Sequence, residues 1–512
     1  MRKQARRTDT AIIIVLIIIA ISIFFSVQKK YRQSDPLPDP LPLESYNGKT
    51  LGALPGSQFE AVTAECFPDS PIAYYTGNPE LYAALITEKI DGFVMSEVTL
   101  IQMQREHLNV TWLPDILNTR YRYFGFAKTA KGEKLCAQMD EMLAEFKADG
   151  TMTELENIWY GEDDTRKIVD DSDLTGKNGT LKVGVSTSDE PYNYVRNNQI
   201  TGFNIDILTR FARRFGYAIE YTDTEPSSLL IGLTTGRFDM LATTISYTEE
   251  RAQTILFSDP ALQFDTVLAV RQEAAAVQQQ PGLLESLAES FKKTFIREER
   301  WKLIVKGIGT TCLITITAAI LGTLLAFAIC LFRRTGSTLA NMISDIYVKL
   351  MQGIPIVVLL LILYYVIFRQ SVLAAVWIAA IGFSLHFGAY TSETLRSGIN
   401  SVAPGQREAA LALGFSERQA FYQFIFPQAV NHILPVYNGE IISLLKGTAI
   451  AGYISVQDLT KMSDIIRSRT YEAFFPLIAT ALIYFLLAWI IRLLLKAVMK
   501  WIDPRKKGGK NK

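Results

Sequence analysis

The stretch Tyr390–Pro427, YTSETLRSGINSVAPGQREAALALGFSERQAFYQFIFP, is a polar, helix-patterned segment that lies between strongly apolar runs. Pro404 suits the first turn of a helix, where a missing N–H costs nothing, and Gly414 is a natural stop for that helix. Ser416 and Gln419 predict a capping box that opens a second short helix, ending before the next proline. An ordinary linker needs neither two capped helices nor an alanine-rich face, so we expect another surface to dock on this segment.

This stretch resembles the EAA loop of ABC-importer permeases, specifically of the polar-amino-acid uptake family. The residues that match its motif are Glu408, Ala409, Ala410, Gly414 and Pro427. The resemblance implies that residues 393–427 form a cytoplasmic coupling loop, which seats in a groove of a separate ATPase subunit. It also implies that Glu408, Ala409, Ala410 and Gly414 make that coupling contact.

Hydropathy predicts a multi-pass membrane protein. Six apolar segments are long enough to cross a hydrocarbon core of ~30 Å at ~1.5 Å per residue. They lie at about 11–27, 304–332, 340–368, 372–392, 430–454 and 472–498. The last five predict an all-α permease domain over residues 301–500, and the first, within residues 1–28, predicts an N-terminal anchor. A cleaved signal peptide is the alternative, but no small-x-small cleavage site follows the apolar run.

Basic residues predict the orientation in the plasma (inner) membrane. Positive charges gather before the first span, at Arg333–Arg334 and at the chain end. Because such charges stay in the cytoplasm, six spans place both termini and the 393–427 loop inside. Residues 28–300 then lie outside the cell membrane.

Several function classes are excluded by composition. A net charge of +1 with no basic stripe argues against nucleic-acid binding. The three histidines and four cysteines form no cluster with metal-ligand spacing, so no metal site is predicted. No GxxxxGK[ST] sequence occurs, so this chain is not expected to cradle ATP phosphates itself. The resemblance implies a transporter subunit rather than an enzyme. ATP is then used by the partner, a cytoplasmic ATPase dimer.

The predicted outside region has an α/β pattern bounded by linkers. A Pro-rich spacer occupies residues 34–46, and a second linker occupies 273–300. Between them, short β-rich runs alternate with helical patterns. The segments 82–95 and 230–243 share an apolar helix face, a basic residue, an aspartate and a buried strand. This similarity favours two lobes built alike, although such units recur in many α/β proteins.

In detail, residues 180–272 resemble the first lobe of polar-amino-acid binding proteins, from TLKVGVSTSDEPYNY to TTISYTEERAQTILFSDP. Residues 46–128 resemble the second lobe, and 129–165 resemble the C-terminal helical return. This implies an α/β, two-lobed, periplasmic-binding-protein-like domain. The lobes come in inverted order, which favours one circularly permuted domain; two truncated domains would each leave an apolar face uncovered.

In the first lobe, Arg251 is the leading ligand-binding candidate. Thr248 predicts a helix N-cap, which puts Arg251 at the third helical position, where a cation opposes the helix dipole unless an anion binds. In the resembled family the matching arginine clamps the ligand carboxylate. Family hydroxyl donors match Thr244 and Ser246, and an aromatic that packs on the ligand matches Tyr192.

In the second lobe, Ser57 and Gln58 match a loop that also meets the ligand carboxylate. The family aspartate that holds the ligand ammonium group falls on Ser96 here. Asp189 or Glu97 is a candidate to replace it, since an unpaired buried ammonium is costly. The expected ligand is a small polar solute, with an amino acid as the first candidate.

The predicted function is ATP-driven import by a fused binding and permease subunit. Five permease spans make half of a pore, which predicts a homodimer in the lipid bilayer. The alternatives are a ligand-gated channel and a membrane sensor. A glutamate-receptor-type channel needs its lobes split around a pore loop, and a sensor needs a cytoplasmic signalling domain. Neither feature is visible in the sequence.

Overall fold

The computed structural model describes residues 41–55, 57–106, 108–245, 247–272, 283–369, 371, 373–472 and 474–502. The chain divides into two compact units. The first comprises residues 1–303 and 463–479, and the second comprises 304–462 and 480–512. The expected first span lies outside the described residues, as do parts of both predicted linkers.

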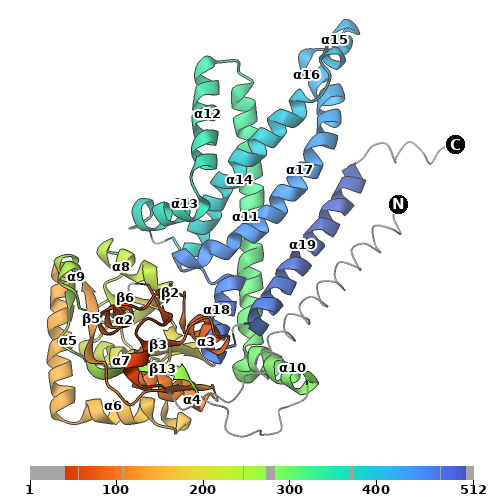
Figure 1. Ribbon diagram of the computed structural model, residues 1–512. Helices are drawn as coiled ribbons and strands as arrows, with labels where there is room; N and C mark the ends of the chain where they lie inside the picture. Colours follow the sequence, from red (N-terminus) through yellow and green to blue (C-terminus); the bar gives the residue numbers. More distant parts are fainter. Residues whose placement is uncertain are drawn as a thin grey trace. The chain divides into compact units, whose positions relative to one another are not determined.

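The first unit is an α/β structure with two lobes (Figure 1). Its second lobe, named as in the sequence analysis, is built from alternating short strands and helices of the first hundred described residues. They are β1 (Leu51–Ala53), α2 (Gln58–Cys66), β2 (Ile72–Tyr74), α3 (Asn78–Ile86), β3 (Gly92–Ser96), α4 (Glu97–Arg105) and β4 (Val110–Trp112).

The first lobe follows a helical pair and has the same alternation. The helical pair is α5 (Ala130–Ala148) and α6 (Thr151–Tyr160). The lobe elements are β6 (Thr180–Val185), β7 (Ser188–Asp189), β8 (Asn193–Arg196), β9 (Gln199–Thr201), α7 (Phe203–Phe215), β10 (Ala218–Asp223), α8 (Pro226–Thr234), β11 (Met240–Ile245), α9 (Glu249–Thr254) and β12 (Ile255–Phe257).

Two long strands, β5 (Asn118–Ala127) and β13 (Leu262–Arg271), connect the lobes. The first halves of the two strands pair antiparallel with each other, from Leu262↔Arg122 to Thr266↔Asn118. Beyond that crossing, β5 enters the first-lobe sheet against β11 and β12. In the same way β13 enters the second-lobe sheet against β3 and β4.

The two lobes therefore share one strand order. The first-lobe sheet runs β10-β6-β11-β5, with β12 on the far side of β5, and the second-lobe sheet runs β2-β1-β3-β13, with β4 beyond β13. In each lobe the order is second, first and third strand, then a strand arriving from the other lobe, then the fourth. The expectation of two lobes built alike agrees with this topology.

Each lobe has its own apolar core. The α5–α6 pair packs onto the first lobe through Leu135, Met139, Leu155 and Trp159, all fully buried. The Trp159 indole N–H donates to Asp206 of α7 over 3.0 Å, which satisfies a polar group in the core. The pair thus covers an apolar face of the first lobe that would otherwise be exposed to water.

The second unit is helical. Its helices are α11 (Trp301–Arg333), α12 (Thr338–Gly353), α13 (Ile356–Ile362), α14 (Ala375–Asn400), α15 (Pro404–Ala412), α16 (Glu417–Ala420), α17 (Phe426–Gly447), α18 (Leu459–Thr470) and α19 (Phe474–Ile502). Residues 301–303 of α11, 463–470 of α18 and 474–479 of α19 are counted in the first unit. Helices α14 and α17 lie side by side in this unit (Figure 1).

The expected membrane spans are realised in different ways. Helices α11 and α19 are long and apolar enough to cross a membrane. The span expected at 340–368 falls on α12 and the following helix, which are bent by 105° at a break before Pro355. A proline removes a helical N–H and constrains the residue before it, which explains the break. The spans expected at 372–392 and 430–454 fall on α14 and α17, which carry more polar residues.

One predicted helix end is wrong. The second short helix was expected to stop before Pro427, but α16 continues through a π-helical turn, Phe421–Ile425, into α17. Pro427 lies where the π-helical turn passes into α17, so its missing N–H falls at a point where the regular i→i−4 ladder already changes. The wider π turn accommodates the change of register.

Candidate functional site

The polar groups expected to bind a ligand follow the carboxyl ends of strands in both lobes. Ser57 follows β1 and caps α2, accepting a hydrogen bond from the Glu60 N–H over 3.2 Å. Thr248 follows β11 and caps α9, accepting from the Arg251 N–H over 3.2 Å, as the sequence predicted. Ligands of open α/β sheets bind at such strand ends, so the placement suits a solute site.

Ser96 has a structural task as well. It caps α4 after β3, accepting from the Thr99 N–H over 3.3 Å, and its hydroxyl lies 2.8 Å from the Thr99 hydroxyl. Both side chains are fully buried. A serine at this position thus satisfies local donors and supplies no negative charge to a ligand ammonium group.

Arg122, on the crossing strand β5, is the residue that sequence reasoning missed. Its Nη1 lies 2.9 Å from the Asp189 Oδ2, and its guanidinium carbon lies 3.8 Å from the Tyr192 ring centre and 4.9 Å from the Phe264 ring centre. Burial alone would lower the pKa of Arg122, but Asp189 and Tyr192 counter it and the pKa is raised. A buried, charged arginine therefore lies at the junction of the lobes.

Two predicted ligand residues meet at this arginine. Asp189 lies on β7 with its carboxylate against Arg122, and the fully buried Tyr192 presents its ring to the guanidinium. Burial raises the pKa of Tyr192, so its hydroxyl stays neutral. Because Asp189 already has a cationic partner, a ligand ammonium group would share this carboxylate with Arg122.

The other predicted residues lie elsewhere on the two lobes. Thr244 is on β11, and Arg251 is a half-buried residue of the short helix α9 that follows. Ser57 and Gln58 lie at the start of α2 in the second lobe. Ser246 lies outside the described residues. The contacts described here unite Asp189 and Tyr192 around Arg122 but do not join them to Arg251.

The predicted coupling loop forms a compact helical elbow in the second unit. Glu408 and Ala409 of α15 are exposed, and Leu413 after it is 75% exposed. Ala410 is only 2% exposed, so its small side chain packs inward instead of offering a surface. Gly414 adopts φ +88, the left-handed conformation that glycine tolerates best, and ends α15 as predicted.

Side-chain contacts hold the elbow in shape. Ser416 and Gln419 form the predicted capping box of α16. Arg407 of α15 pairs with Glu417 of α16, with the Arg407 Nε donating over 3.0 Å. Arg334 lies 4.0 Å over the Phe421 ring, and Arg333 pairs with Glu393 at 3.2 Å. The basic pair after α11 therefore contacts the loop, in agreement with the expectation that both face the same side.

A polar contact within the helical unit was not predicted from the sequence. Glu440 of α17 accepts hydrogen bonds from Thr391, over 2.9 Å, and from Thr394 of α14. Acidic residues inside membrane helices are rare and usually functional. The signal available in the sequence was the single acid in the otherwise uncharged stretch from Pro427 to Leu445.

Two protein families match parts of this chain. Residues 181–354 match the family of bacterial extracellular solute-binding proteins, family 3. Residues 318–508 match the family of binding-protein-dependent transport system inner membrane components.

Individual relatives match over little more than a third of this chain. The probable amino-acid ABC transporter permease YckA of Bacillus subtilis is 37% identical over 187 residues, 36% of this chain and 83% of the relative. A putative glutamine transport system permease protein of Rickettsia typhi is 32% identical over 199 residues, 38% of this chain and 91% of the relative. The arginine transport system permease ArtQ of Bacillus subtilis is 32% identical over 197 residues, 38% of this chain and 90% of the relative.

Proposed function

Because the chain belongs to the family of ABC amino-acid import permeases, here fused to a family-3 solute-binding domain, we propose how its own residues capture and hand over the solute. The chain is a multi-pass protein of the inner membrane with an extracytoplasmic binding domain, and a transporter subunit rather than an enzyme. The presence of both family matches on one polypeptide is the observation that carries the proposal. Capture and translocation are then tasks of a single chain.

The solute we propose is an α-amino acid with a polar side chain. Relatives that cover most of the permease part are named for glutamine and arginine transport. Arg251, with Thr244 and Ser246, binds the carboxylate from the first lobe, and Ser57 and Gln58 add donors from the second lobe. A guanidinium offers two parallel N–H donors that match a carboxylate.

The ammonium group is held by Asp189, which lies beside Tyr192 at the lobe junction. In this assignment Asp189 replaces the family aspartate, whose position is taken by Ser96 in this chain. Arg122 pairs with Asp189 at 2.9 Å. With two cationic partners, both oxygens of the carboxylate accept hydrogen bonds. When the solute is absent, the carboxylate keeps Arg122 as its partner.

On the cytoplasmic side, a separate ATPase dimer docks on the elbow of α15 and α16. The contact is made by the exposed Glu408, Ala409 and Leu413, while Ala410 and Gly414 shape the elbow. ATP is bound by the partner and not by this chain. The ion pair of Arg407 with Glu417 joins the two helices of the elbow, which connects α14 to α17.

Two such chains form the complete importer, a homodimer with two binding domains and with all chain ends in the cytoplasm. Each chain supplies one half of the translocation pathway, as its helical unit is too small to enclose a pore alone. Heterodimers with another permease are the alternative that oligomer analysis distinguishes.

The binding domain is one circularly permuted unit. The shared strand order supports this, because β5 and β13 each complete the sheet of the opposite lobe. Two truncated domains would not need strands that exchange between sheets. The segment 162–179 then joins the ends that are free in an unpermuted domain.

A reconstitution experiment tests the function. Full chains in proteoliposomes, with a matching ATPase subunit, should show ATPase activity that rises severalfold with one amino acid added outside. Arg251→Ala should lower the affinity for that amino acid by ~100-fold, as expected for a lost charge-assisted carboxylate contact of ~3 kcal/mol. Lys182→Ala, a change of an exposed residue on β6 in the same lobe, is the control. Ion conduction without ATP, or no stimulation by any amino acid, would contradict the proposal.

A further inference from the structure

Residues 463–472 come from the C-terminal part of the chain yet pack within the first unit. This segment comprises the end of α18 and the turn that leads to α19. It carries Arg467, Arg469 and Tyr471, whose side chains are all buried or nearly so. Long basic side chains are rarely buried unless paired, so their partners identify what the segment recognises.

One set of contacts reaches the second lobe. Arg467 forms an ion pair with Glu80 in the first turn of α3. Tyr471 is 4% exposed and belongs to the apolar cluster of Leu81, Leu100 and Met103. These contacts place the segment against the starts of α3 and α4, where the polar strand ends of this lobe lie.

A second set of contacts reaches the first lobe. Arg469 forms an ion pair with Glu190, and the two side chains are 9% and 6% exposed. The guanidinium carbon of Arg469 lies 4.9 Å from the Tyr194 ring centre. Glu190 directly follows Asp189, the proposed ammonium ligand, and also accepts a hydrogen bond from Gln102 of α4 over 3.3 Å.

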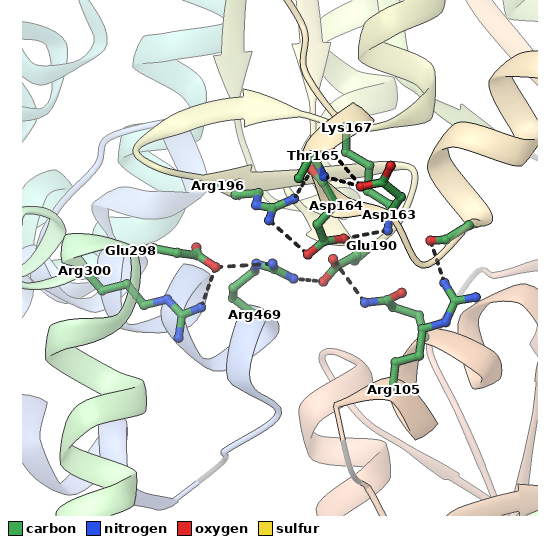
Figure 2. Close-up of polar contacts among 12 residues, drawn as sticks. Arg105, Asp163, Asp164, Thr165, Lys167, Glu190, Arg196, Glu298, Arg300 and Arg469 are labelled. Atoms are coloured by element: carbon green, nitrogen blue, oxygen red, sulfur yellow. Dashed lines mark hydrogen bonds and ion pairs between the residues drawn. The ribbon is translucent and has the colours of Figure 1, made fainter.

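Charges of alternating sign surround Arg469, as Figure 2 shows. Arg300 pairs with Glu298 at 3.1 Å, Glu298 lies 3.3 Å from Arg469, and Arg469 meets Glu190. Because each of these charges has an opposite neighbour, the arrangement is a built interface rather than a chance surface contact.

The backbone of the segment is constrained as well. Tyr471 has φ +52, a left-handed conformation that is unusual for a bulky residue. Such conformations persist where the surroundings determine them, and they gather at functional sites. Here the burial of the Tyr471 ring in the second lobe holds the backbone in this conformation.

We propose that residues 463–472 bind to both lobes of the binding domain, at the surface between them. The segment and the solute cannot occupy this surface at the same time. The proposal rests on the proposed solute site. Arg467 and Arg469 are two residues apart on one helix, so they hold Glu80 and Glu190 of different lobes at a set spacing. In this arrangement Ser96 and Tyr192 are fully buried, so neither side chain is open to a solute.

Thermodynamic linkage then gives the consequence. Suppose that the solute favours a spacing of the lobes at which the segment cannot bind. The bound segment must then lower the affinity for the solute, and the bound solute must lower the affinity for the segment by the same factor. When the segment binds to the lobes again after capture, it therefore expels the solute from them. The segment is covalently continuous with α18 and α19, so the helices can drive that step.

Hydrogen exchange on the full-length chain in lipid nanodiscs tests the seating without any solute. Residues 463–472 should exchange at least tenfold more slowly in the wild type than in the Glu80→Gln/Glu190→Gln variant. The Arg214→Ala variant, which removes ion pairs to Glu141 and Glu145 in the first lobe, should leave the segment protected. Equal exchange in the wild type and the Glu80/Glu190 variant would overturn the proposal.

The second measurement tests the exclusion, with L-glutamine as the first probe and the other common amino acids after it. Arg467→Ala/Arg469→Ala should bind the amino acid about tenfold more tightly than the wild type, and Arg214→Ala should bind it equally well. Saturating amino acid should speed exchange in residues 463–472 of the wild type. Unchanged or weaker binding by the double variant, or slower exchange with solute, would overturn the exclusion.

The two proposals fail in distinguishable ways. If no amino acid binds either the wild type or the double variant, the proposed solute class is wrong. The solute-free exchange measurement still decides in that case whether the segment is seated on both lobes. If an amino acid binds but the double variant behaves as the wild type, only the exclusion is wrong.

Discussion

Arg122 illustrates how a single residue links stability to function. It lies on one of the two strands that cross between the lobes, and it pairs with Asp189 while its guanidinium faces two aromatic rings. Arg120, two positions earlier, pairs with Glu65 on the surface. The same residue type on the same strand thus has two environments, and the difference between them can be measured.

We expect Arg122→Ala to lower the free energy of unfolding by ~3 kcal/mol, because it leaves the partly buried Asp189 without its cation and opens a space beside Tyr192. Arg120→Ala should cost less than ~1 kcal/mol, since exposed pairs contribute little. Thermal unfolding of the purified full-length variants, followed by tryptophan fluorescence, measures both. Equal losses would show that Arg122 is not a structural pair.

Cys136 gives a second test at this scale. Burial, followed in size by the nearby Asp140, raises the pKa of its thiol to about 12, and the thiol also donates to the Phe257 carbonyl over 3.2 Å. Because only the thiolate reacts, alkylation by iodoacetamide at pH 8 should be about 1000-fold slower than for a free cysteine. Mass spectrometry of the native and the urea-unfolded chain follows this site. Native labelling as fast as unfolded labelling would contradict the burial of the thiol.

At the scale of elements, tight turns decide where helices begin. Gly202 precedes α7 with φ +131, and a Cβ added there would lie 2.2 Å from the Tyr192 carbonyl oxygen. Gly150 precedes α6 with φ +85, and nothing lies within 4 Å of its added Cβ. Both glycines allow a backbone conformation with positive φ. Only Gly202 also allows the Tyr192 carbonyl group to pack closely against it.

Gly202→Ala should therefore destabilise the chain by ~3 kcal/mol, from strain together with a backbone clash that cannot relax. Gly150→Ala carries the strain alone and should cost about 1 kcal/mol. Unfolding temperatures of the two full-length variants provide the comparison. The solute affinity should also fall in Gly202→Ala, since Tyr192 moves with its carbonyl. A loss no larger than that of Gly150→Ala would contradict the packing argument.

At the scale of the whole molecule, the positions of charges along the chain predict its orientation. The basic pair after α11 contacts the α15–α16 elbow through Glu393 and Phe421, so the two belong to the same side of the membrane. The positive-inside rule assigns that side to the cytoplasm. The binding domain lies on the opposite side.

Cysteine labelling checks this orientation. In a background without the four native cysteines, Gly405→Cys should react with a membrane-impermeant maleimide only after the cells are permeabilised. Gly150→Cys, on the binding domain, should react in spheroplasts without permeabilisation. Both glycines have open space for a side chain, so neither change disturbs the fold through a clash. Labelling of Gly405→Cys from outside would reverse the proposed topology and remove the ATPase contact.

Local chemistry explains which predictions from the sequence were confirmed. The caps at Ser416 and Thr248 and the left-handed Gly414 depend on neighbours within four residues, so the sequence contains all that determines them. The helix end predicted before Pro427 was wrong, and the bend within the expected span at 340–368 was not predicted. Both features concern prolines, where packing decides whether the chain breaks or adapts through a wider turn.

By itself, the sequence determined the class of protein, because membrane spans, coupling loop and lobe patterns are periodic or local signals. Only the tertiary structure revealed that Arg122 meets Asp189, that β5 and β13 exchange between sheets, and that residues 463–472 reach both lobes. These contacts join residues 67 to 387 positions apart in the chain. No periodicity records such pairings, since they arise only when separate cores pack together.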